Sequence, residues 1–176
     1  MKKVLITGAN KSIGFEAARQ LLKSGYYVYL GCRDLEKGEQ AVAQLHTENL
    51  NHVEALLIDV DQAESIARAR KILSEKTDVL DVLINNAGIS GGFPQTAESA
   101  NPKTFRDVFE TNFFGVIQTT QAFLDLLKAS PQPRIVNVTS GLGSLTLHND
   151  PSWKYYAVKG AAYTASKAAL NAYTIV

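Results

Sequence analysis

Thr7-Gly8-Ala9-Asn10-Lys11-Ser12-Ile13-Gly14 is the stretch that decides the fold of this chain of 176 residues. It follows a short apolar run, Lys3-Val4-Leu5-Ile6, of the kind that forms a buried strand. After it, apolar residues recur at helical spacing as far as Gly25. The pattern predicts a strand, a glycine turn and then a helix that begins near Lys11 or Ser12 and ends at Gly25.

Such a turn is a ready-made site for an anion. The unpaired N–H groups of the first helical turn and the positive end of the helix dipole face any anion bound there. Gly8 allows a tight turn, and Gly14 allows the helix to lie close to the sheet. Glycines alone would also fit an ordinary strand-to-helix turn, so the flanking strand and helix are what favour a nucleotide.

The composition limits the classes of protein to which the chain can belong. An apolar fraction of 45% is typical of a globular domain, and a net charge of +1 argues against a protein that coats nucleic acid or anionic membrane. No apolar run approaches the ~20 residues that span a bilayer, and the N-terminus does not resemble a signal peptide. The lone Cys32 agrees with a reducing compartment, and the scattered histidines lack metal-ligand spacing. We therefore expect a cytoplasmic protein with no metal, nucleic-acid or membrane partner.

Strands and helices alternate along the rest of the chain. Further strands are predicted at residues 26–32, 52–58, 79–84 and 134–139. Helix starts are predicted at Asp34, at an Asp61–Glu64 capping box and at Asn101, from which a long helix runs to about Ala129. This order predicts an α/β fold: a three-layer, doubly wound parallel sheet (Rossmann fold) that binds ligands beyond the carboxyl ends of its strands.

The end of the second strand indicates which dinucleotide fits. An NAD-selective site places an acidic residue about 20 residues beyond the glycine turn, but Cys32 and Arg33 stand here. A guanidinium suits a 2′-phosphate, and Lys11 could supply a second cation. Asp34 is a counterargument, although a helix cap is the commoner use of an Asp at this point. The pattern favours NADP(H) over NAD.

The glycine turn resembles that of the short-chain dehydrogenase/reductase family, which reads Thr-Gly-x-x-x-Gly-x-Gly. Ser12 departs from this pattern by replacing its middle glycine; its Cβ would crowd a pyrophosphate, whereas its hydroxyl could donate a hydrogen bond. The resemblance covers the whole chain. Together with Arg33, it implies a cofactor site made by Gly8, Asn10, Lys11, Ser12, Ile13, Gly14, Arg33, Asp59, Val60, Asn86, Ala87, Gly88, Tyr163 and Lys167.

Two groups of these positions follow later strands. In the resembled family, the residues at Asp59 and Val60 hold the adenine amino group and pack on its ring, although an Asp at this point could simply start a turn. Asn85-Asn86-Ala87-Gly88 is more specific, because two asparagines directly after a buried strand are hard to explain as core packing. The family uses this sequence to steady the sheet and border the cofactor.

Tyr163 and Lys167 are the candidates for proton transfer. At i and i+4 of a helix they share one face, and an ammonium beside a phenol lowers the pKa of the phenol. The spacing alone is common among solvated pairs. By resemblance, Ser140 binds the substrate oxygen, Tyr163 protonates it, Lys167 holds the ribose hydroxyls and poises Tyr163, and Asn112 binds a water of a proton relay.

Tyr155 and Lys159 repeat the same spacing and lie closer to Ser140 in the sequence. We favour Tyr163 because Gly160 would weaken a helix through the earlier pair. An insertion before the tyrosine also occurs in the carbonyl-reductase branch of the family, which this chain further resembles in Gly8-Ala9-Asn10-Lys11 and Cys32-Arg33-Asp34. The insert is expected to border the substrate pocket, with Trp153 either in that pocket or in a local core.

The chain stops inside the helix that begins at Tyr163, whereas family members continue through a further strand, a substrate-covering segment and a last strand. We expect a single dinucleotide-binding catalytic domain over residues 1–176 without those parts, as a piece of a longer protein or a shortened product. The expected function is NADPH-dependent reduction of a small carbonyl compound to an alcohol. The alternative is a catalytically silent NADP-binding protein that senses redox state or binds a partner. Homo-oligomerisation is open.

Overall fold

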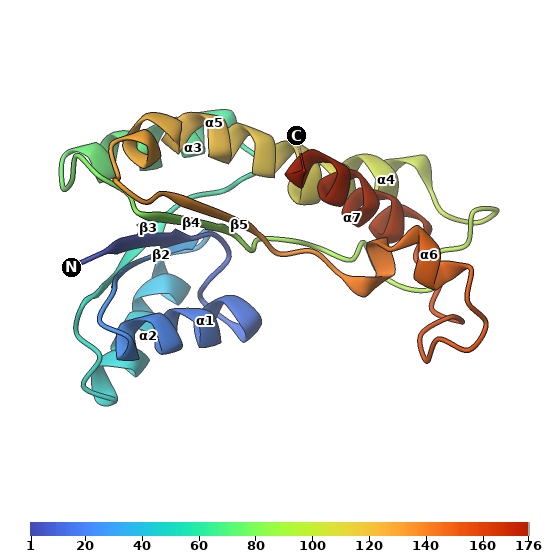
Figure 1. Cartoon of the computed structure of the whole chain (residues 1–176), viewed down its shortest axis with the longest axis horizontal. Helices are drawn as coiled ribbons and strands as arrows, with labels where there is room; N and C mark the ends of the chain where they lie inside the picture. Colours follow the sequence, from blue (N-terminus) through green and yellow to red (C-terminus); the bar gives the residue numbers. More distant parts are fainter. Residues whose placement is uncertain (176) are drawn as a thin grey trace. The chain divides into compact units, whose positions relative to one another are not determined.

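The computed structural model describes residues 1–175, and its main feature is a sheet of five strands in the order β3-β2-β1-β4-β5 (Figure 1). The pairings of β1 with β2, β1 with β4 and β2 with β3 are parallel. The strands are β1 (Lys3–Ile6), β2 (Tyr27–Cys32), β3 (Val53–Leu57), β4 (Val82–Asn85) and β5 (Arg134–Asn137). The predicted doubly wound sheet is confirmed, with each strand inside its predicted range or one residue beyond it.

The chain forms two units. One consists of residues 1–87 and 117–136, and the other of residues 88–116 together with those from 137 onward. The first unit contains the sheet and the glycine turn, whereas the second contains Asn112, Ser140, Tyr163 and Lys167. The residues predicted to bind the cofactor and those predicted to transfer the proton therefore belong largely to different units.

In the first unit, helices cover both faces of the sheet. Helices α1 (Ser12–Lys23) and α2 (Leu35–Thr47) lie on one face, and α3 (Ala63–Ser74) and α5 (Gly115–Lys128) lie on the other (Figure 1). Along β1, Val4 and Ile6 belong to one buried cluster and Leu5 to the other. Because successive side chains of a strand point to opposite faces, a sheet covered on both faces needs the continuous apolar run seen in the sequence.

The sheet reverses its order between β3 and β4, because the chain returns past β1 to add the next strand. Ile6 of β1 therefore pairs with Ile84 of β4, and the turns that follow these strands emerge side by side. Such a reversal is where doubly wound sheets bind ligands. It brings the glycine turn to the Asn-Asn-Ala-Gly segment.

The second unit is mostly helical. Its elements are α4 (Pro102–Phe109), the π-helical turn η1 (Glu110–Phe114), the start of α5, the 3₁₀ turn η2 (Gly141–Gly143), α6 (Leu145–His148) and α7 (Ala161–Thr174). The predicted long helix from Asn101 to about Ala129 is present as the consecutive segments α4, η1 and α5, and the π-helical turn within it was not predicted. This wide turn contains Asn112, a poor helix former.

Two of the three predicted helix caps are present. Asp34 accepts a hydrogen bond from the Lys37 amide at 3.2 Å, and Asn101 accepts one from the Lys103 amide at 2.8 Å. The predicted Asp61 capping box is wrong, because α3 begins after Gln62, which makes no side-chain cap. These two caps fix the starts of α2 and α4.

Residues 1–175 contain no helix that is both long and apolar enough to cross a bilayer. Over the same residues, no group of three or more His, Cys, Asp or Glu side chains is arranged to hold a metal ion. Cys32 is buried at the end of β2, where its sulfur lies 3.9 Å from the Leu56 carbonyl oxygen.

Candidate active site

The glycine turn is fastened to the end of β4 by Thr7 and Asn86. The Thr7 hydroxyl accepts hydrogen bonds from the amides of Asn86 and Ala87, at 3.0 and 3.1 Å. In return, Asn86 Nδ2 donates to the carbonyl oxygens of Thr7 and Gly8, at 2.9 and 3.0 Å. Gly8 has a φ of +64°, and a Cβ there would lie 2.9 Å from Ala87 Cα. The turn therefore requires glycine at position 8.

Helix α1 starts directly against this turn. A Cβ on Gly14 would lie 2.5 Å from Asn86 Nδ2 and 2.8 Å from the Gly8 carbonyl oxygen, so only glycine permits this approach. Lys11 stands at the N-cap and makes no side-chain cap, and the side chains of Lys11, Ser12 and Ile13 are exposed. The start of α1 thus has the form of the predicted anion site.

Ser12 has a φ of +52°, in the left-handed region that favours glycine. It is the one position of the turn that departs from the family pattern. Ser12 therefore adopts a backbone conformation typical of glycine although it has a Cβ, and this strain costs about 1–3 kcal/mol.

Arg33 follows β2 and is exposed. Its neighbour Asp34 caps α2 and forms an ion pair with Lys37 at 2.7 Å. The hydrogen bond from the Lys37 side chain, followed by that from the Lys37 amide, lowers the pKa of Asp34. Asp34 is thus used as a helix cap, as predicted, and its charge is already balanced by Lys37.

Asp59 and Val60 follow β3. The carboxylate of Asp59 accepts a hydrogen bond from the Asp61 amide at 3.1 Å, and the Asp59 amide donates to the Ser65 hydroxyl at 2.9 Å. Asp59 therefore organises a local turn, which is the simpler of its two predicted roles. Val60 is buried with 7% of its surface exposed. A role for either residue in holding adenine stays a prediction.

In the second unit, Asn112 joins two segments. Its Oδ1 accepts from the Ile89 amide at 2.8 Å, and its Nδ2 donates to the Ile89 carbonyl at 2.9 Å and to the Ser166 hydroxyl at 3.0 Å. The side chain is completely buried. Asn112 therefore holds the segment after Gly88 and the helix that carries Tyr163.

Tyr163 and Lys167 lie on one face of α7, as their spacing predicts: Lys167 Nζ is 6.0 Å from the centre of the Tyr163 ring. Lys167 Nζ donates to the Val138 carbonyl at 2.7 Å, and only 4% of the residue is exposed. Burial lowers the pKa of Lys167 to about 8, because the charged form loses its hydration.

Ser140 opens the 3₁₀ turn η2, where its hydroxyl oxygen accepts a hydrogen bond from the Leu142 amide at 3.1 Å. The same turn packs on α7, since a Cβ at Gly143 would lie 2.8 Å from the Lys167 carbonyl carbon. The second unit thus brings the Ser140 turn and the Asn112 turn against the helix of Tyr163 and Lys167.

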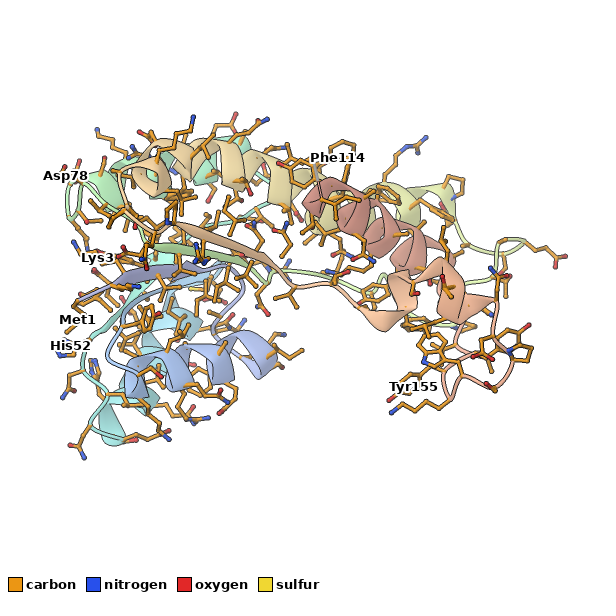
Figure 2. The ribbon with its side chains drawn as sticks, in the orientation of Figure 1. Met1, Lys3, His52, Asp78, Phe114 and Tyr155 are labelled. Carbon is orange, nitrogen blue, oxygen red and sulfur yellow. The ribbon has the colours of Figure 1, made fainter. Side chains whose placement is uncertain are left out.

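Tyr155 has a different setting. It lies in the loop after α6, outside any helix, with 47% of its surface exposed (Figure 2). Lys159 Nζ lies 3.9 Å from the centre of the Tyr156 ring and 3.4 Å from His148 Nδ1. The earlier Tyr–Lys pair therefore lacks the shared helical face that its spacing would give it in a helix.

Trp153 packs inside this loop. Its ring centre lies 5.3 Å from that of His148 and 5.6 Å from that of Tyr155, in edge-to-face contacts. Its ring would also lie 3.3 Å from a Cβ at Gly141, next to Ser140. Trp153 thus forms the local aromatic core that the sequence offered as one of its two roles, beside the turn that holds Ser140.

Three residues of the site were missed from the sequence. Thr7 binds the end of β4, Ser166 bridges Asn112 to α7, and Gln95 contacts the first turn of α7. For Thr7, a hydroxyl placed directly before the first glycine of the turn was an available signal. Nothing in the spacing of Ser166 or Gln95 distinguishes them from ordinary polar residues.

Comparison with known proteins places these features in a family. Residues 2–176 match the family model described as short chain dehydrogenase. A short-chain dehydrogenase of Penicillium roqueforti is 44% identical over 96% of this chain and 68% of its own length. The next two relatives are covered over 66% and 62% of their lengths, so the chain spans about two thirds of the relatives it matches.

Solved structures show the same fold. Salutaridine reductase from Papaver somniferum superposes with a TM-score of 0.84 at 29% identity, over 99% of this chain and 80% of that one. The NADPH-bound carbonyl reductase from chicken fatty liver gives a TM-score of 0.85 at 28% identity, over 99% of this chain and 71% of that one.

Replacing Ser12 by glycine should stabilise the protein by about 1 kcal/mol, because glycine adopts a positive φ without strain. The free energy of unfolding in urea measures this change. Ser12→Ala is the matched control, since it also removes the hydroxyl but keeps the Cβ, and it should give no gain. Equal stability of the two variants would contradict the assignment of strain to the Ser12 backbone.

Lys167→Met should raise stability at pH 7, because the folded wild type must bury an ammonium whose pKa is lowered from 10.5 to about 8. This shift corresponds to about 3 kcal/mol, from which the lost hydrogen bond to Val138 subtracts about 1 kcal/mol. Between pH 8 and 10.5 folded Lys167 is neutral while unfolded Lys167 still binds its proton. The stability of the wild type therefore rises with pH in this range, and the difference in unfolding free energy between Lys167→Met and wild type becomes smaller.

Chemical unfolding at several pH values measures this difference. The control is Lys128→Met, at an exposed position, which should leave the pH dependence unchanged. A stability difference between wild type and Lys167→Met that stays constant from pH 7 to 10.5 would show that burial does not penalise this charge.

Proposed function

Because the chain belongs to the short-chain dehydrogenase family, we propose that it is an NADPH-dependent oxidoreductase that reduces an aldehyde or ketone to the alcohol. The observation that carries the proposal is the Tyr163–Lys167 pair on α7, in which a buried amine lies beside a phenol. The pair therefore places a hydroxyl that can donate a proton and a buried amine on one face of the same helix.

The first unit fits a dinucleotide. Gly8 and Gly14 let the turn and the start of α1 pack closely against the end of β4, and α1 starts without a side-chain cap, as an anion site at a helix N-terminus requires. Exposed Arg33 supports NADPH as the cofactor, because its guanidinium can form two hydrogen bonds with a 2′-phosphate. The neighbouring Asp34 forms its ion pair with Lys37. Two structural neighbours, the chicken carbonyl reductase and an archaeal alcohol dehydrogenase, contain NADPH and 5-hydroxy-NADP.

NADPH, when bound, supplies a hydride to the carbonyl carbon. Tyr163 gives the proton that the carbonyl oxygen needs, so that the product is a neutral alcohol. Ser140 can donate a hydrogen bond to the same oxygen, since its own oxygen accepts from the Leu142 amide and its hydrogen is left to donate. Lys167 stabilises the phenolate that remains on Tyr163 and, by family resemblance, holds the ribose hydroxyls.

Asn112 contributes by holding its neighbours in place. Both hydrogens of its Nδ2 are used by Ile89 and Ser166, so the amide cannot donate to a relay water without breaking one of these bonds. Oδ1 accepts one hydrogen bond, from the Ile89 amide, and the family resemblance assigns a water to this position. Its buried bonds fix α7 relative to the Ile89 segment.

Tyr163→Phe should lower kcat for carbonyl reduction by at least about 100-fold, because it removes the proton donor and leaves the ring packing intact. The dissociation constant for NADPH should stay near that of wild type. Tyr155→Phe is the matched control and should retain activity. Activity is followed as NADPH oxidation with a panel of aldehydes and ketones, and binding as cofactor fluorescence.

Loss of activity in Tyr155→Phe with retention in Tyr163→Phe would contradict the assigned roles. A wild type that binds NADPH and reduces no carbonyl of the panel would instead support the second function, a catalytically silent NADP-binding protein.

Arg33→Ala should weaken NADPH binding by about 10- to 100-fold and leave NADH binding nearly unchanged, because a hydrogen bond to a charged group contributes about 1.5–3 kcal/mol. Lys128→Ala is the control, since it removes an exposed cation of the first unit and leaves the Asp34–Lys37 pair intact. Titration with each cofactor measures both affinities. Equal weakening of NADPH and NADH binding by Arg33→Ala would refute recognition of the 2′-phosphate.

A further inference from the structure

Helix α7 begins without a cap of its own. Gly160 occupies its N-cap position and has no side chain to accept from the first helical amides. Those amides are instead satisfied by one residue distant in the sequence. The Ala161 amide donates to the Gln95 carbonyl at 3.0 Å, and the amides of Ala162 and Tyr163 donate to Gln95 Oε1 at 3.1 and 3.3 Å. Gln95 therefore caps the first turn of the helix that carries Tyr163.

The other end of the Gln95 amide holds the loop that follows Gly88. Its Nε2 donates to the Ser90 carbonyl at 2.5 Å and to the Gly92 carbonyl. Two carbonyl oxygens face the only donor atom and two amides face the only acceptor atom, so the orientation of the side chain is dictated by its partners. Gln95 is 3% exposed, which shields these bonds from competing water.

The carbonyl of Tyr163 is held as well. Ser166 donates its hydroxyl hydrogen to that carbonyl at 2.8 Å and accepts from Asn112 Nδ2 at 3.0 Å. Asn112 in turn holds both backbone groups of Ile89. The amide and the carbonyl of Tyr163 are thus both tied, through buried side chains, to the same loop segment of residues 89–92.

We propose that Gln95 is a positioning residue for Tyr163: it fixes the first turn of α7 and locks that turn to the loop of residues 89–92. The inference rests on the proposed function, in which Tyr163 is the proton donor. Tyr163 is the third residue of α7, and an uncapped first turn frays. Small displacements of a reacting group are costly, since about 1 Å of misplacement can lower a rate by about 100-fold.

Two substitutions distinguish the role of the acceptor Oε1 of Gln95 from that of its donor Nε2. Gln95→Met keeps the length of the side chain and removes all its hydrogen bonds. Gln95→Glu keeps an acceptor for the amides of Ala162 and Tyr163 and replaces the donor that faces Ser90 and Gly92. The stability control is Asn101→Ala, which removes the cap of α4 in the same unit and has no bond to α7.

We expect Gln95→Met to lower kcat by about 10-fold or more, with the KM for NADPH unchanged and with faster hydrogen exchange at the Ala162 and Tyr163 amides. Gln95→Glu should keep these amides protected, but it should also lower kcat, because its second carboxylate oxygen cannot donate to the Ser90 and Gly92 carbonyls and so loses the bonds to the loop. Its amide protection also provides the test if Gln95→Met does not fold. Asn101→Ala should lower the Tm and leave kcat unchanged.

The proposal is overturned if Gln95→Met retains wild-type kcat, if Gln95→Glu retains wild-type kcat without the donor to Ser90 and Gly92, or if Asn101→Ala loses kcat to the same extent as Gln95→Met. Failure of the proposed function would be seen separately, as a wild type that reduces no carbonyl. Hydrogen exchange still tests the positioning role in that case. If the Ala162 and Tyr163 amides of Gln95→Met are as protected as those of the wild type, the positioning role is overturned.

Discussion

The hydrogen bonds between Thr7 and the Asn86–Ala87 segment are the constraint on which the first unit depends. They join the turns after β1 and β4, at the place where the order of the sheet reverses. Gly8 and Gly14 have no room for side chains because of this junction. The same bonds that complete the fold thus shape the surface that an anionic cofactor would meet, so fold and proposed site have one physical origin.

The second unit uses buried polar side chains in a similar way. Asn112, Gln95 and Ser166 are each buried, and each bridges segments that are distant in the sequence. Such networks are favourable only when their donors and acceptors are satisfied. Lys167 is also buried, but its burial is unfavourable, because the charged amine loses its hydration and its pKa is lowered to about 8. A buried lysine that destabilises the fold and shares a helical face with Tyr163 is more typical of a functional site than of a merely structural helix.

Sequence reasoning succeeded where the signal is local. The apolar runs predicted the strands, and Asp34 and Asn101 predicted two helix starts through bonds that span two or three residues. It failed at Asp61, where the helix starts later, and it did not foresee the π-helical turn inside the long helix that it predicted. The contacts of Gln95 with α7 join residues more than 60 positions apart, and no periodicity encodes such a pairing.

The central claim is that this chain transfers a hydride to a carbonyl carbon while Tyr163 supplies the proton. To test this, the wild-type protein is incubated with NADPH in which both hydrogens at C4 are deuterium and with a reactive aldehyde or ketone, and the label is then located by mass spectrometry. We expect deuterium on the former carbonyl carbon of the alcohol, and formation of this alcohol at least about 100-fold slower with Tyr163→Phe. Saturable NADPH binding by the wild type with no deuterated alcohol from any carbonyl tested would contradict it.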